Sequence, residues 1–206
     1  MKQLLSLVLL LTVLQVSAQK RILYAALHGG FAGAQAYDAK LSSGLGIELE
    51  LPLGEQAYFV TRPTLNFRGF SGSANGLLAV KSTYVDFPVT LEFIAGNPTG
   101  MNLYAGAGVY YGIALAGKIK SNPTFLEEIW TPMKFGEAQT DDRSRTDFGI
   151  NLNGGVRFGE GKRVVKLGIQ TQWGLKNVAP KARQDDAYYN TQRLRNITAY
   201  LSIAIL

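Results

Sequence analysis

The sequence predicts an all-β protein, an eight-stranded antiparallel up-and-down transmembrane β-barrel that follows a cleaved signal peptide. Three observations predict it: apolar and polar residues alternate with a period of two, the alternating runs are long, and short and long connections take turns along the chain. The 206 residues are 47% hydrophobic but only 17% charged, contain 23 glycines, and have a mean hydropathy of +0.04. A barrel with one apolar and one polar face accounts for that average.

Residues 1–18 have the features of a secretory signal peptide. Lys2 supplies the positive start, residues 4–14 form an uncharged, leucine-rich run, and Val16 to Ala18 offer the small residues that a signal peptidase reads. The run is too short to span a bilayer as a helix, which needs about 20 residues. We therefore expect cleavage after Ala18 and a single β-barrel domain over 19–206.

Eight alternating runs are expected to form the strands. The clearest covers 84–93, where Val85, Phe87 and Val89 share one face while Asp86 and Thr90 share the other. Most runs are long enough to cross a membrane, for which a tilted strand needs about 9–11 residues. The eight runs cover residues 22–33, 43–51, 57–68, 83–94, 102–117, 146–158, 164–176 and 194–205.

The connections between these runs alternate in length. Those at 52–56, 95–101 and 159–162 are short and rich in Gly, Pro and Asn. The others, at 34–42, 69–81, 118–145 and 177–193, are longer. Outer-membrane barrels have short periplasmic turns and longer extracellular loops, so this segregation favours a membrane barrel.

Alternation alone does not decide whether the apolar face meets lipid or a soluble core, because a lipocalin-like ligand carrier would reverse the two faces. The aromatic residues favour lipid, since those in the apolar phase gather near both strand ends, where membrane interfaces would lie. Phe59, Phe93 and Phe158 fall near the short turns, and Phe31, Phe67, Phe148 and Trp173 fall towards the long loops.

Charged residues in the polar phase are expected to face the lumen. An eight-stranded barrel is about filled by its own side chains, and buried charges of opposite sign can pair there. We therefore predict a paired internal network and keep a polar pore as the alternative. The predicted lumen-facing charges are Glu48, Glu50, Arg62, Arg68, Asp86, Glu92, Arg157, Lys166 and Arg195.

Composition excludes several kinds of site. With Cys 0 and His 1, the chain has no disulfide, cysteine nucleophile, CxxC motif or histidine-rich metal cluster. His28 has no identifiable catalytic partner, and the basic residues are dispersed, which argues against nucleic-acid binding. We predict no enzyme activity and no cofactor.

The two longest connections carry aromatic residues that, if exposed, would suit a surface for binding a partner. These candidates are Phe125, Trp130, Phe135, Tyr188 and Tyr189. The expected partners are the lipid bilayer of the outer membrane and, at the long loops, lipopolysaccharide or a protein.

Four segments resemble the porin-family outer-membrane β-barrel domain: the Gly-rich run at 44–49, the run with a central proline at 59–65, the segment Tyr-Val-Asp-Phe-Pro-Val at 84–89, and the Gly-rich run at 103–108. The resemblance covers about residues 20–206. It implies an eight-stranded barrel in a bacterial outer membrane, usually without an assigned activity.

The favoured function is therefore a non-enzymatic outer-membrane barrel with a structural or surface-interaction role. A small pore and a soluble periplasmic lipocalin-like carrier are the alternatives.

Overall fold

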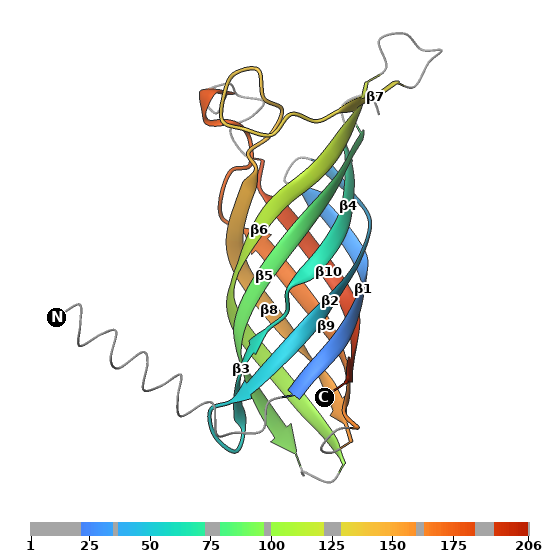
Figure 1. Cartoon of the computed structure of the whole chain (residues 1–206), viewed down its shortest axis with the longest axis vertical. Coiled ribbons are helices and arrows are strands. Elements are labelled where there is room, and N and C mark those ends of the chain that lie inside the picture. Colours follow the sequence, from blue (N-terminus) through green and yellow to red (C-terminus); the bar gives the residue numbers. More distant parts are fainter. Residues whose placement is uncertain are drawn as a thin grey trace, which may run out of the picture.

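The computed structural model describes residues 22–34, 37–72, 79–96, 100–121, 129–159, 163–183 and 192–205, which form one upright barrel (Figure 1). The predicted signal peptide lies outside the described residues. The strands are β1 (Ile22–Ala34), β2 (Tyr37–Pro52), β3 (Ala57–Thr61), β4 (Thr64–Gly72), β5 (Ala79–Gly96), β6 (Met101–Ser121), β7 (Ile129–Pro132), β8 (Thr146–Phe158), β9 (Val165–Gly174) and β10 (Leu194–Ala204).

The strands close into an antiparallel ring. Around the ring the order is β1, β2, β3 together with β4, β5, β6, β8, β9 and β10, each position pairing with the next. β1 then pairs with β10 from Tyr24 opposite Ala204 to Ala34 opposite Leu194. Among the described residues the one helix is the short 3-10 turn η1 (Lys181–Arg183), and no helix there is long and apolar enough to cross a membrane. The predicted eight-stranded, all-β barrel is confirmed.

Two differences from the expected strand count have local causes. The run expected at 57–68 is divided into β3 and β4 at Arg62 and Pro63, since proline has no amide proton to donate to a neighbouring strand. Both halves pair with β2 on one side and β5 on the other, so together they make one position of the ring. The additional strand, β7, pairs with the last residues of β6 above the ring (Figure 1).

The strands reach further towards the long-loop end than the alternation predicts. β1 continues to Ala34 and β2 begins at Tyr37, so the expected long connection at 34–42 is mostly strand. The connection expected at 69–81 is likewise shortened, with β4 ending at Gly72 and β5 beginning at Ala79. Backbone pairing persists beyond the lipid-facing band, where side chains no longer have to alternate between apolar and polar.

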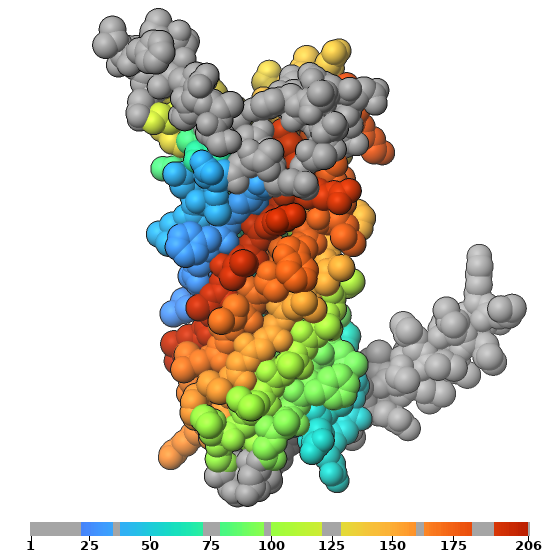
Figure 2. Space-filling model, turned by 180° about the vertical axis from the view of Figure 1, so that it is seen from behind, coloured from blue at the N-terminus to red at the C-terminus, as the bar shows by residue number. Residues whose placement is uncertain are grey.

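The two faces of the sheet differ sharply in chemistry. Outside, Leu27, Phe31 and Val109 are each at least 60% exposed, whereas inside, Glu48 and Lys166 are completely buried. The expected aromatic residues near the strand ends are all exposed, and Figure 2 shows side chains of β1, β10, β9 and β8 packed in diagonal bands around the outside. A soluble lipocalin-like carrier needs the opposite arrangement, so that alternative is wrong.

Candidate functional site

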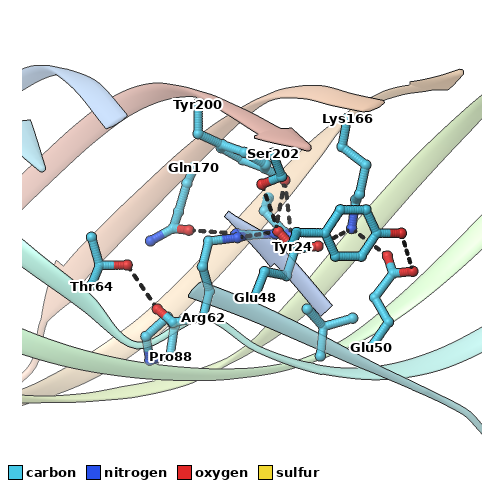
Figure 3. Close-up of polar contacts among 12 residues, drawn as sticks. Tyr24, Glu48, Glu50, Arg62, Thr64, Pro88, Lys166, Gln170, Tyr200 and Ser202 are labelled. Carbon is cyan, nitrogen blue, oxygen red and sulfur yellow. Dashed lines mark hydrogen bonds and ion pairs between the residues drawn. The ribbon is translucent and has the colours of Figure 1, made fainter. Parts of the chain in front are cut away.

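The lower half of the lumen contains a lysine surrounded by three glutamates. Lys166 projects inward from β9, and its Nζ lies 2.6 Å from Glu48, 2.7 Å from Glu50 and 2.7 Å from Glu92 (Figure 3). These carboxylates come from β2 and β5, so the contacts cross the barrel. The Tyr24 hydroxyl donates a further hydrogen bond of 2.6 Å to Glu50.

Arg62 forms the second cationic centre of this network. Its Nε donates to Glu48 at 2.6 Å, its Nη1 donates to Gln170 at 2.8 Å, and its guanidinium carbon lies 4.0 Å from the centre of the Tyr200 ring. The break between β3 and β4 carries this side chain, which is 2% exposed. A planar guanidinium is well suited to this combination of hydrogen bonding and ring stacking.

We call the group formed by Lys166, Arg62, Arg157 and the three glutamates, nearest the short turns, the lower network; its charges balance. Arg157 approaches Glu50 at 3.5 Å, so three cations face the three glutamates. Removing charges from water is costly unless they are paired and hydrogen-bonded, and both conditions are met here. Carboxylate oxygens of the three glutamates lie within 4.8 Å of one another, a spacing that could hold a metal ion, but the Lys166 ammonium is already bonded to all three.

A second polar group lies nearer the long-loop end. Arg68 and Asn66 both donate to Asp86, and Arg68 also donates to Gln172 at 3.0 Å. Gly112 of β6 lies between Asp86 on β5 and Asp147 on β8. The Asp147 carboxylate accepts a hydrogen bond of 2.6 Å from the Tyr110 hydroxyl. Charged and hydrogen-bonded side chains therefore continue up the lumen from the lower network.

Apolar side chains cover the lumen above these groups. We call this cluster the cap. Strand ends contribute Phe70 and Leu194, while Met133 and Val178 come from the two longest connections. The cap comprises Ala34, Phe70, Val80, Tyr84, Ala114, Met133, Val178 and Leu194.

Backbone hydrogen bonds join the two long connections across the cap. The Ser144 amide of the first connection donates to the Val178 carbonyl of the second at 2.7 Å. Within the second connection, the Val178 amide donates to the carbonyl of Gln192 at 2.8 Å. The described parts of both connections are therefore ordered over the barrel mouth.

Glu137 strengthens the junction between the two connections, and we call its contacts the latch. It accepts from the Ser144 hydroxyl at 2.7 Å, from the Lys181 amide at 3.0 Å and from Lys176 at 3.4 Å. Partial desolvation raises the pKa of Glu137, but these hydrogen bonds and the Lys176 charge outweigh it and hold the pKa below its ordinary value of 4.5.

The structure places the predicted lumen-facing charges inside the barrel with one exception. Arg195 is exposed on the outer surface, opposite Gly33 on β1 and Trp173 on β9. Its position on β10 shares a face with Ile197, so the period of two directs it outward and the assignment to the lumen is wrong. The residues placed inside are Glu48, Glu50, Arg62, Arg68, Asp86, Glu92, Arg157 and Lys166.

The predicted loop aromatics have different positions. Phe135 packs against the cap and is partly buried, so it does not offer the exposed surface expected of it. Trp130 lies on β7 beside the outer surface, with the Lys81 Nζ 4.9 Å from its ring centre. Phe125, Tyr188 and Tyr189 lie outside the described residues.

Several residues of the network were not predicted from the sequence. Tyr24, Tyr200 and Gln170 face inward and bond to the charges described above, and Asp147 faces inward and accepts from the Tyr110 hydroxyl. Their signal was the polar phase of their strands, but that phase does not reveal which partner a side chain will meet. Glu137 carried no signal, because its partners come from two separate connections.

Comparison with known proteins agrees with this architecture. The profile of the "Outer membrane protein beta-barrel domain" family matches residues 10–179. No curated protein matches significantly.

Solved structures show the same fold at low sequence identity. Neisserial surface protein A is 8% identical, with a TM-score of 0.51, over 90% of this chain and 97% of its own. The outer membrane enzyme PagL is 12% identical, with a TM-score of 0.50, over 89% of this chain and 99% of its own. The profile covers most of the chain, and the barrel carries its apolar face outside and its charges inside. The chain therefore belongs to the outer-membrane β-barrel domain family and is located in the bacterial outer membrane.

Proposed function

We propose that this protein is a closed, non-enzymatic barrel that has a structural or surface-interaction role and presents its long connections outside the cell. The observation that carries the proposal is the obstructed lumen: a balanced charge network fills the lower half and an apolar cap covers the upper end. A barrel obstructed in this way offers a rigid support for its loops instead of a path for solutes.

The obstruction argues against the pore alternative. Ions crossing the barrel would have to pass Lys166 and Arg62, both completely or almost completely buried and bonded to side chains on other strands. They would then meet the cap, whose apolar side chains do not replace a hydration shell, and the buried Arg143, whose guanidinium lies over the ring of Phe70 and would repel cations.

The fold does not by itself exclude catalysis, because PagL is an enzyme with a similar barrel. Among the residues that the structure describes, Ser144 and Lys176 resemble a catalytic pair, since their Oγ and Nζ are 2.6 Å apart. Ser144 is completely buried and its hydroxyl donates a hydrogen bond to Glu137, while Lys176 donates a hydrogen bond to Ser144. A buried hydroxyl in these contacts serves to hold the loops together, which supports a non-enzymatic role.

Conductance in planar lipid bilayers tests closure. We expect the purified barrel to give no steady current steps, while a known porin inserted in the same bilayers gives them. Reproducible steps from the purified barrel would overturn the closed state and favour the pore.

Epitope labelling of intact cells tests which end faces outside. A tag inserted within 122–128 is expected to bind antibody on intact cells. The matched control is a tag in the turn between β2 and β3, at residues 53–56, which is expected to bind antibody only after the outer membrane is permeabilised. The reverse result would invert the barrel and remove the surface role.

A further inference from the structure

A groove of about 630 Å³ crosses the outer surface of the barrel near β7, on strands that Figure 1 shows rising to the long-loop end. We call it the lysine groove. β2, β4, β5, β6 and β7 all contribute to it. Its walls include four lysines together with the large apolar side chains of Leu41, Phe67, Phe70 and Trp130. The lysines are Lys40, Lys81, Lys118 and Lys120.

Small outward-facing residues and an irregularity of β6 create the hollow. Gly69 lies between the walls, and a Cβ there would come within 3.3 Å of the Cβ of Lys40. In β6, Leu115 and Ala116 are both exposed, where the pairing with β5 shifts its register. This β-bulge reverses the alternation, so Lys118 points outward and Gly117 turns towards the cap.

The groove brings positively charged side chains close together on neighbouring strands, an arrangement that is unfavourable in a sheet. Lys81 and Lys118 are direct partners across β5 and β6, and like charges in that position destabilise a sheet. None of the described lining residues is acidic, and within the described part of the chain Lys40, Lys81 and Lys118 form no ion pair. An anion in the groove would relieve this repulsion.

The depth of the groove favours a lipid as the source of that anion. Phe67, at its lower wall, belongs to the exposed aromatic residues near the long-loop end, where a membrane interface would lie. Leu41, also in the lining, is 75% exposed. Lysines at headgroup level above exposed apolar side chains match a molecule with phosphate groups at one end and acyl chains at the other.

We propose that the lysine groove binds the phosphate groups of an outer-leaflet lipid, with an acyl chain lying against Leu41 and Phe67. The site lies on the strands and goes beyond the loop-borne role proposed above. The lipid site depends on the proposed function only in one respect, the orientation that places the long-loop end outside the cell.

Lipid titration of the purified barrel in a neutral detergent tests the site. The probes are lipopolysaccharide and the same lipid after enzymatic dephosphorylation, and binding is followed by native mass spectrometry. We expect the double variant Lys81→Gln/Lys118→Gln to bind the phosphorylated lipid less tightly, by about fivefold for each lysine neutralised. Without lipid, its melting temperature is expected to equal or exceed that of the parent, because the repulsion between the paired lysines is removed.

Two further variants separate the groove from general effects of charge. Ala116→Trp fills the exposed groove while keeping every lysine, and it is expected to weaken binding as well. The matched control is Arg195→Gln, which removes an exposed cation from β10, on the far side of the ring from β5. It is expected to leave lipid binding unchanged.

The titrations would overturn the proposal if they showed equal loss of binding in Arg195→Gln, full binding in both groove variants, or equal affinity for the dephosphorylated lipid. Complete displacement of the lipid by an equal concentration of inorganic phosphate would also overturn it, since acyl contacts would then contribute nothing. A conducting barrel would refute the proposed closure without changing this titration, so the two failures are distinguishable.

Discussion

At the scale of single residues, Lys166 is the side chain whose removal should disturb the barrel most. Lys166→Met keeps much of the side-chain length but leaves Glu48, Glu50 and Glu92 without the ammonium that joins them. We expect the free energy of unfolding to fall by about 3–5 kcal/mol, because breaking a buried ion pair leaves uncompensated charge. Urea unfolding of the reconstituted barrel measures it.

The control for that variant adds Glu50→Gln to Lys166→Met. Removing one of the unpaired negative charges should recover part of the lost stability. A single variant as stable as the parent would contradict the expected role of Lys166.

Arg195 and Val89 test how the cost of an outward charge varies with depth. Val89 faces outward on β5 opposite Val109, within the apolar band, so Val89→Arg is expected to destabilise the barrel by about 2–4 kcal/mol. Arg195 lies beside Trp173 near the rim, so Arg195→Leu is expected to change the stability by less than about 1 kcal/mol. Folding titrations in lipid vesicles measure both, and equal effects would contradict the assigned depths.

At the scale of the strands, inward glycines allow neighbouring backbones to approach closely. A Cβ on Gly108 would lie 1.9 Å from the carbonyl oxygen of Val89, whereas a Cβ on Gly29 would meet nothing within 4 Å. Gly108→Ala is therefore expected to lower the free energy of unfolding by about 1–3 kcal/mol, since the strands must move apart. Gly29→Ala, the matched control, should be neutral or slightly stabilising. Equilibrium unfolding compares them, and equal losses would show that the close approach is unimportant.

At the scale of the loops, the latch is expected to respond to pH. The pKa of Glu137 is lower in the folded protein than its ordinary value of 4.5, so its contribution is complete above that pH and is lost as the pH falls through the folded pKa. Limited proteolysis should cut the two connections faster in acid, while the barrel strands stay intact. The Glu137→Gln variant should be cleaved rapidly at neutral pH, and its cleavage rate should lose most of its dependence on acid. Unchanged acid dependence in this variant would assign the effect to another group.

At the scale of the whole molecule, closure of the ring makes the barrel resistant to detergent. β1 pairs with β10 over eleven positions, so the described sheet closes on itself and β1 gains a partner on each side. Unheated protein in sodium dodecyl sulfate is expected to stay compact and migrate faster on a gel than boiled protein. Identical mobility before and after boiling would contradict a stable closed barrel.

Much of the barrel could be predicted from local patterns. Alternation over 84–93 assigns Val89 to the outside and Thr90 to the inside without knowledge of any partner, and the structure agrees. The same rule, applied consistently to β10, would also have put Arg195 outside with Ile197. Strand ends were less predictable, since β1 and β2 continue pairing after the alternation fades.

The sequence by itself determined the fold class, the two faces and which charged positions of most strands point inward, because a period of two is a local property of the extended chain. Only the tertiary structure decided which charges meet. Lys166 and Glu48 are 118 positions apart, and their contact requires the ring to close in one register. The cap, the latch and the lysine groove likewise combine side chains from several strands or loops. Their positions are set by long-range pairing and by one bulge in β6, which local patterns do not contain.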